Sequence, residues 1–181
     1  DLRNTPAEIL RSCLGNQTDY FLGMAKGEDT RLVTLPEAPL SIGREHTFGE
    51  DIYREDQLKS NLQSLADDVA SRLRNQKYAA YTITLKIKYA DFTLITRSVT
   101  TENASSQTKQ IYQTGLSLLE KIKDIRKKGV RLIGISASQL TASEEGQLYL
   151  FEDQVDEKQQ SIDKVMDNIR ARYGKKIIFP G

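Results

Sequence analysis

Leucine and valine recur every three or four positions between residues 55 and 76. This spacing places them on one face of an α-helix, so the segment predicts an amphipathic helix whose apolar stripe packs on a core. The residues of the stripe are Leu58, Leu62, Leu65, Val69 and Leu73.

Residues 81–100 follow a different period, because apolar and polar side chains alternate one by one. Ile83, Leu85 and Ile87 fall on one side of an extended chain. Threonine and lysine fall on the other side, at Thr82, Thr84, Lys86 and Lys88. Ala90 and Asp91 form a credible turn, so the segment predicts a β-hairpin with a second strand over 92–100.

The remaining segments complete a recognisable order of elements. SIGREHTF at 41–48 predicts a strand, and VRLIGISAS at 130–138 predicts another. Between the hairpin and that last strand, a second amphipathic helix is predicted from about residue 106 to the KDIRKKG stretch before Gly129. The order strand, helix, strand, strand, helix, strand predicts an α+β ferredoxin-like fold. In that fold a four-stranded antiparallel sheet carries both helices on one face.

The flanking segments predict smaller additions to this domain. Short helices are expected over 6–14 and 19–26, and the two prolines of RLVTLPEAPLSIG, Pro36 and Pro39, favour a stiff connector. The tail predicts an amphipathic helix ended by Gly174. Its apolar residues are Ile162, Val165, Met166, Ile169 and Tyr173. We therefore expect a helical piece over 1–32, a linker over 33–40, the α+β domain over 41–141 and a tail over 142–181.

Charge is divided unevenly among these parts, although the whole chain carries a net charge of only +1. Residues 41–141 hold 16 basic and 11 acidic side chains, a net charge of +5, while each flank has a net charge of −2. The predicted domain is thus the part of the chain suited to a polyanionic partner.

Several kinds of site are disfavoured by the composition. A single cysteine, Cys13, and a single histidine, His46, leave almost no material for a disulfide framework, a zinc site or a Cys–His pair. Cys13 is expected to be a core thiol. Asp67 and Asp68 are adjacent on a helix and diverge, so we interpret them as surface charges. No apolar stretch approaches the ~20 residues of a membrane span, so no membrane partner is expected.

The polar side of the hairpin offers hydroxyl and ammonium donors of short reach, which suit phosphate oxygens better than base edges. Exposed aromatic residues of the kind that stack single-stranded RNA are missing from these strand positions. Two alternatives stay open. Threonine and lysine are also common on strand faces that only meet water. In addition, Ile95 and Val99 share a side with Arg97, so either Arg97 lies among apolar groups or the strand is bulged.

Near the end of the chain, EEGQLYLFED places a compact apolar run between carboxylates at residues 144–153. One interpretation is a fifth edge strand or a staple for the tail helix. The other is a short docking tag, with Leu150 and Phe151 as anchors and Gln147 fixing the register.

Taken together, SIGREHTF after a proline-containing connector, YTITLKIKYADFTLITRSVTT and VRLIGIS resemble the little-finger domain of the Y-family translesion DNA polymerases. The similarity is greatest to the bacterial polymerase IV and UmuC-like group. DLRNTPAEILRSCLGNQTDYFLGMAKGEDT resembles the end of that family's thumb domain, so the resemblance covers nearly the whole chain.

The resemblance implies a sheet that holds the phosphate backbone of primer–template DNA. The positions that it implies for DNA binding lie at the end of the linker, on the hairpin and on the last strand. They are Ser41, Gly43, Arg44, Thr84, Lys86, Thr96, Arg97, Ser98, Gly134 and Ser136. Gly43 and Gly134 would let backbone N–H groups approach a phosphate.

QLYLF also resembles the pentapeptide that binds the bacterial sliding clamp, which implies clamp contacts by Gln147, Leu148, Leu150 and Phe151. The family acts in error-prone damage bypass during the SOS response, in the cytoplasm at the bacterial nucleoid. Its nucleotidyl transfer needs palm-domain carboxylates and Mg²⁺. Those carboxylate motifs are missing here, so we expect no catalytic residue and no cofactor in this chain. The alternative is a ferredoxin-like regulatory or protein-interaction domain that binds no nucleic acid.

Overall fold

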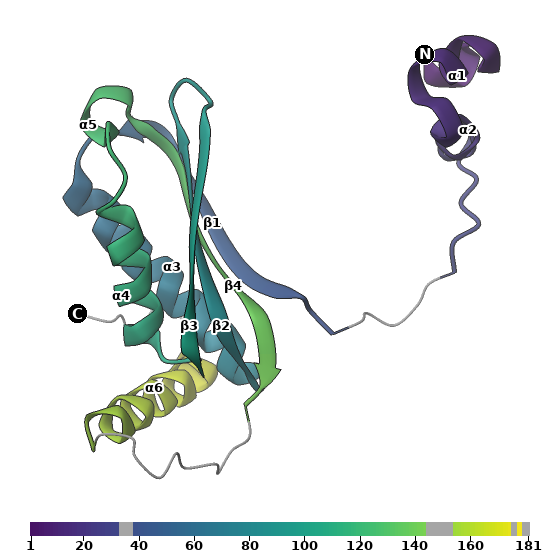
Figure 1. The fold of residues 1–181 in the computed structure, drawn as a ribbon. Coiled ribbons are helices and arrows are strands. Elements are labelled where there is room, and N and C mark those ends of the chain that lie inside the picture. Colours follow the sequence, from purple (N-terminus) through teal and green to yellow (C-terminus); the bar gives the residue numbers. More distant parts are fainter. Residues whose placement is uncertain (33–37, 144–153, 175–176, 179–181) are drawn as a thin grey trace. The chain divides into compact units, whose positions relative to one another are not determined.

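A computed structural model describes residues 1–32, 38–143, 154–174 and 177–178 of the chain (Figure 1). The chain divides into two compact units, Asp1–Ala38 and Pro39–Gly181. The predicted subdivision of the second unit into 41–141 and a tail is not tested by this division and stays a prediction.

The first unit contains two short α-helices, as the sequence predicts. Its elements are the 3₁₀ turns η1 (Leu2–Asn4) and η2 (Gly15–Gln17) and the helices α1 (Ala7–Leu14) and α2 (Thr18–Lys26). Gly27 ends α2 at φ 83°, a left-handed conformation that favours glycine. The expectation that Cys13 is a core thiol is wrong, because its side chain is exposed on this small unit.

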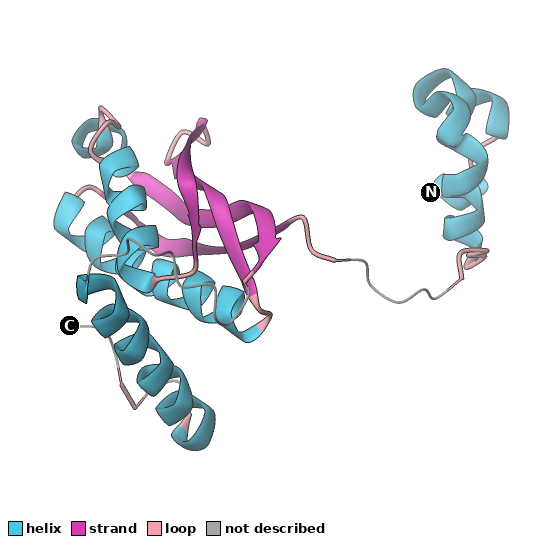
Figure 2. Ribbon diagram, turned by 60° about the horizontal axis from the view of Figure 1, so that its bottom comes forward, coloured by secondary structure: helices cyan, strands magenta, loops and turns pink. Residues whose placement is uncertain are grey.

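The second unit is the predicted α+β domain. Its sheet contains β1 (Ser41–Ile52), β2 (Tyr78–Tyr89), β3 (Leu94–Ser105) and β4 (Val130–Ala142). The strands are all antiparallel and lie in the order β1-β4-β2-β3. The helices are α3 (Glu55–Asn75), α4 (Thr108–Leu119), α5 (Ile125–Lys128) and α6 (Gln154–Tyr173). Helices α3 and α4 cover the same face of the sheet, which confirms the predicted split β-α-β-β-α-β arrangement (Figures 1 and 2).

The core lies between α3, α4 and the sheet. The five predicted residues of the α3 stripe are all buried, and Leu58, Leu62 and Leu73 are completely inaccessible to solvent. On the sheet side, Leu85 and Ile87 are also fully buried, so the period-two pattern placed its apolar residues correctly. Burial of each such side chain stabilises the fold by about 1.5–3 kcal/mol.

The predicted helix from residue 106 to the KDIRKKG stretch is wrong in its second half. Helix α4 ends at Leu119, and a separate short turn, α5, follows after Asp124, whose φ of 67° breaks the helix. The break allows both Ile122 and Ile125 to be buried. It also exposes the carbonyl group of Lys123 as a partner for the buried Tyr89, whose hydroxyl donates to it at 2.7 Å.

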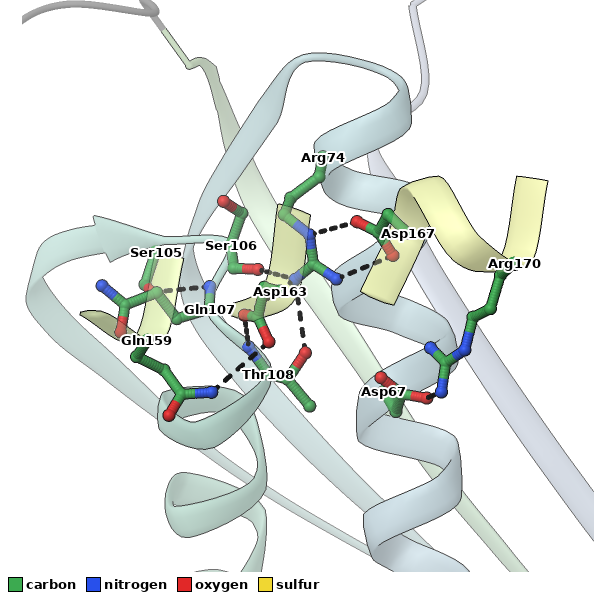
Figure 3. Close-up of polar contacts among 10 residues, drawn as sticks. All are labelled: Asp67, Arg74, Ser105, Ser106, Gln107, Thr108, Gln159, Asp163, Asp167 and Arg170. Atoms are coloured by element: carbon green, nitrogen blue, oxygen red, sulfur yellow. Dashed lines mark hydrogen bonds and ion pairs between the residues drawn. The ribbon is translucent and has the colours of Figure 1, made fainter. Parts of the chain in front are cut away.

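Helix α6 forms where the sequence predicts it, but it packs on the domain through its polar side (Figure 3). The guanidinium group of Arg74, from α3, binds both oxygens of Asp167 at 2.6 and 3.1 Å and one oxygen of Asp163 at 3.2 Å. Asp163 also accepts from the backbone N–H of Thr108 at 3.0 Å, at the start of α4. These charged groups are therefore buried together, and the side chain of Asp163 is only 4% exposed.

A second ion pair joins α6 to α3 and corrects one sequence prediction. Asp67 is a buried carboxylate rather than a surface charge, because Arg170 of α6 reaches it at 2.7 Å. Since α6 uses its charged residues for packing, much of its predicted apolar stripe is left outside. Ile162, Val165 and Tyr173 are between 43% and 66% exposed.

Candidate nucleic-acid interface

The sheet face opposite α3 and α4 carries the polar side chains that the sequence predicts, arranged in rows across the four strands. Residues directly opposite each other in neighbouring strands project from the same face. One row, in the order β1-β4-β2-β3, is Gly43, Ser136, Thr84 and Ser98. The next row is Glu45, Gly134, Lys86 and Thr96. We call this surface the open face.

Gly134 makes room for an ion pair that spans three strands. The carboxylate of Glu45 on β1 reaches over β4 and accepts from the ammonium group of Lys86 on β2 at 2.8 Å. A Cβ atom on Gly134 would lie 2.6 Å from Cγ of Glu45. Because β4 is paired on both sides at this residue, the N–H of Gly134 is directed at a neighbouring strand and not at solvent. Glycine is therefore needed at position 134 because a larger side chain would collide with Glu45 where it reaches Lys86.

Gly43 occupies a similarly crowded position in the neighbouring row. A Cβ atom there would lie 2.8 Å from Cβ of Ser136, so only glycine lets β1 approach β4 this closely. Farther along the face, the hydroxyl groups of Thr82 and Thr100 lie 2.8 Å apart and share a hydrogen bond. The result is a polar surface made largely of small side chains.

Eight of the ten predicted DNA-binding residues line one concave region on this face, with a volume of about 650 Å³. The eight are Ser41, Gly43, Arg44, Thr84, Lys86, Thr96, Gly134 and Ser136. Glu45, Leu94 and Ile135 complete the lining. Ser98 lies opposite Thr84 on the same face.

The two predicted arginines project from the other side of the sheet, at its two edge strands. Arg44 of β1 is in register with the buried Ile135, and its guanidinium group lies 3.7 Å from Asp68 of α3. Arg97 of β3 is in register with the buried Leu85, yet it is exposed because no further strand covers that edge. The ladder is regular at this point, so Arg97 does not sit in a bulge. Arg44 therefore reaches the concave region only at its edge, and the side chains of both arginines flank the open face.

Sequence reasoning missed the acidic member of the site. Glu45 lies within the predicted strand SIGREHTF, and the period of two that places Gly43 on the open face also places Glu45 there. The same period identifies Ser138 as a further hydroxyl of the face, in register with Thr82. The pairing of Glu45 with Lys86 was not predictable, because it depends on the order of the strands in the sheet.

The turn of the β2–β3 hairpin, at one end of the open face, is held by a carboxylate. Asp91 accepts from the backbone N–H of Thr93 at 2.8 Å and from Lys128 at 3.3 Å. The hydrogen bonds with Thr93, reinforced by Lys128, hold the pKa of Asp91 below its ordinary value. The pKa of the nearby Tyr89 is raised, chiefly because its phenol is removed from water.

Three other expectations concern features outside this face. The clamp-binding candidates Gln147, Leu148, Leu150 and Phe151 lie outside the described residues. Within the described residues, no group of three or more His, Cys, Asp or Glu side chains is arranged to hold a metal ion. No helix in the described part of the chain is long and apolar enough to cross a membrane.

Comparison with known proteins points to one family. Residues 39–150 match the model of the impB/mucB/samB family C-terminal domain. The chain is 34% identical over 182 residues to DNA polymerase IV of Desulfatibacillum aliphaticivorans. The matched stretch covers 99% of this chain and 46% of that protein. It is also 34% identical over 169 residues to DNA polymerase IV of Dehalococcoides mccartyi, covering 93% of this chain and 43% of that protein. The chain thus spans less than half the length of these relatives.

A solved structure agrees with this at the level of the fold. A Y-family DNA polymerase chimera superimposes with a TM-score of 0.50 at 17% identity, covering 78% of this chain and 41% of that one. The match of the family model over more than half of the chain identifies the family. The chain belongs to the Y family of DNA polymerases and contains that family's C-terminal domain.

Proposed function

We propose that the open face grips primer–template DNA through its phosphate backbone during error-prone bypass of DNA damage. The observation that carries this proposal is the pair of rows that contain Thr84 and Lys86, which bring hydroxyl groups and an ammonium group together on one exposed side of the sheet. Such donors of short reach fit phosphate oxygens, which position a protein on a duplex without reading its sequence. The accessible location of the face, opposite both core helices, leaves it available to a partner (Figure 2).

The Glu45–Lys86 pair is compatible with this function, because it is a weak interaction that can be exchanged. The side chains of Lys86 and Glu45 are 34% and 46% exposed, so water screens their attraction. A phosphate that approaches Lys86 competes with a carboxylate of the same charge. Glu45 would also repel a phosphate that is wrongly placed, and it therefore limits the positions that the backbone can take.

Arg44 and Arg97 add positive charge at the two sides of the face. Their side chains project from the other side of the sheet at its two edge strands, so they raise the positive potential around the face and are not placed to contact a duplex laid on it. The exposed charge that results is modest. We therefore expect moderate affinity, with a salt dependence of about 0.9 in log K for each phosphate neutralised.

A docking segment would compensate for moderate affinity. We infer from the sequence that Gln147, Leu148, Leu150 and Phe151 bind the apolar groove of the bacterial sliding clamp. Burial of Leu150 and Phe151 contributes roughly 1.5–3 kcal/mol each, which suits an affinity near micromolar. Engagement of DNA and clamp together raises the effective concentration of each for the other. Nucleotidyl transfer, with its Mg²⁺, would belong to the rest of a longer polymerase.

The DNA-binding proposal is tested by the affinity for a blunt duplex, measured by fluorescence anisotropy over a series of salt concentrations. Lys86→Glu should weaken binding strongly and reduce the salt dependence. Lys109→Glu makes the same change of charge on α4, on the opposite side of the sheet, and should have little effect. Equal losses of duplex affinity in the two variants would show that binding depends on the net charge of the chain and not on the open face. Absence of duplex binding, together with self-association, would instead favour the regulatory-domain alternative.

The clamp proposal needs a separate test with purified sliding clamp. Leu150→Ala combined with Phe151→Ala should abolish clamp capture and leave the affinity for duplex unchanged. Ile162→Ala combined with Val165→Ala removes two exposed apolar side chains from α6 and serves as the control. Capture that survives the first pair of substitutions would exclude the pentapeptide as the docking segment.

A further inference from the structure

The tip of the β2–β3 hairpin holds an aromatic ring in an unusual position. Phe92 is 63% exposed, and its backbone has a φ of 64°. A bulky side chain rarely occupies this left-handed region, where glycine or asparagine fits with less strain. Since the ring gains little burial there, neither packing nor backbone preference explains a phenylalanine at this position. Strained residues of this kind concentrate at functional sites.

The tip is fixed to the rest of the domain, so the ring is presented from a rigid support. The backbone N–H of Phe92 donates to the carbonyl of Tyr89 at 3.0 Å, which closes the turn. The N–H of Ala90 donates to the carbonyl of Gly129 at 3.1 Å, which ties the hairpin to the residue before β4. Asp91, bonded to Lys128 across the same gap, supports this attachment from a side chain.

Two cations lie against the ring of Phe92. The guanidinium carbon of Arg131 is 4.9 Å from the ring centroid, and the ammonium nitrogen of Lys88 is 5.9 Å from it. The register between β2 and β4 shifts at this point, from Lys88 opposite Leu132 to Tyr89 opposite Val130. Arg131 is therefore the extra residue of a bulge. Bulges re-aim side chains and are common beside functional sites.

The cluster continues the open face and carries positive charge. Lys88 follows Lys86 on the same side of β2, and its cross-strand neighbour Leu94 is 50% exposed. Arg131 is paired with Asp51 at 3.1 Å. Among the described residues, no carboxylate forms an ion pair with Lys88. An exposed ring with an ammonium group and a guanidinium group beside it has the composition of a single-strand nucleic-acid site.

We propose that Phe92, Lys88 and Arg131 form a subsite for an unpaired nucleotide next to the duplex held by the open face. The nucleobase stacks on the ring of Phe92 in place of Lys88, the more distant of the two cations, and its phosphate is bound by Lys88 and Arg131. This subsite rests on the proposed duplex binding, which it extends by a second class of substrate. An intact duplex does not supply this ligand, because its bases are already stacked on each other, whereas a single-stranded extension does.

The experiment compares three probes by fluorescence anisotropy with the full chain: a blunt duplex, the same duplex with a single-stranded extension, and a short oligothymidine. Phe92→Asn should weaken binding to the oligothymidine and to the extended duplex by about tenfold, the effect of one lost stacking contact. Affinity for the blunt duplex should stay unchanged. Asparagine tolerates the left-handed conformation, so this variant should fold at least as well as the original chain. Phe92→Tyr should retain binding.

Two further variants separate the failure of this subsite from the failure of the open face. Lys86→Glu should weaken binding to all duplexes, with or without an extension. Val99→Asn removes another exposed apolar side chain from β3, on the opposite side of the sheet, and should change nothing. If the chain binds the blunt duplex but Phe92→Asn leaves the affinity for the extension intact, the subsite is refuted and the open face stands. If Lys86→Glu is also without effect, both proposals fail.

Discussion

Replacement of Arg74 by alanine should release α6 from the domain. Arg74 is the centre of the polar contact between α3 and α6, and its side chain is only 15% exposed. It makes two hydrogen bonds to Asp167 and one to Asp163, and it donates to the carbonyl of Ser106 at 2.8 Å. Without the guanidinium group, two carboxylates of the same charge remain buried with no cation at this position.

Loss of one partner from a buried ion pair costs about 3–5 kcal/mol, because the remaining charge is left desolvated. Here the chain can avoid most of that cost if α6 separates and both carboxylates return to water. The cost therefore appears as lost docking of α6 and not as global unfolding. A change of about 3 kcal/mol corresponds to a factor of about 100 in the docking equilibrium.

Hydrogen exchange measures this equilibrium residue by residue. Backbone amides of α6 should lose protection by about 100-fold in Arg74→Ala, while those of the central strands β2 and β4 keep theirs. Arg126→Ala removes an exposed ion pair with Glu55 and should leave α6 unchanged, since surface pairs contribute little. Full protection of α6 in Arg74→Ala would refute the view that buried charges hold this helix.

Three further predictions concern the sheet. Gly134→Ala should destabilise the domain by about 1–3 kcal/mol in urea unfolding and displace Glu45, because the added methyl group overpacks the open face. Leu85→Ala should cost about 2–5 kcal/mol in the same assay, since the side chain is fully buried, and a smaller loss would contradict the described core. The lowered pKa of Asp91 means that its bond to Thr93 contributes stability above the ordinary carboxyl pKa of about 3.9. That contribution is lost as the pH falls through the lowered value. An NMR titration of Asp91 with a midpoint at or above the ordinary value would refute this assignment.

The sequence by itself determined the elements whose signals are local. The stripe from Leu58 to Leu73 depends on contacts three or four residues apart, and the alternation from Ile83 to Ile87 depends on neighbours two residues apart. Both patterns identify their buried side without reference to any other part of the chain. Because the order of such elements allows few topologies, the sheet with two covering helices also followed from the sequence.

Tertiary structure alone decided which residues meet. The Glu45–Lys86 pair joins residues 41 positions apart, and it exists only because β4 lies between β1 and β2 with a glycine at the crossing point. The burial of Asp67 depends on Arg170, more than a hundred residues later in the chain.

Helix α6 shows most clearly which features the sequence determined and which only the tertiary structure decided. Its period correctly predicted a helix, but not the side that would face the domain. An apolar stripe normally marks the buried side, whereas here Arg74 supplies a buried cation that makes the acidic side the better match. A local pattern records how one element could be buried. Which of its sides is buried depends on the charge and shape of distant elements that the pattern does not contain.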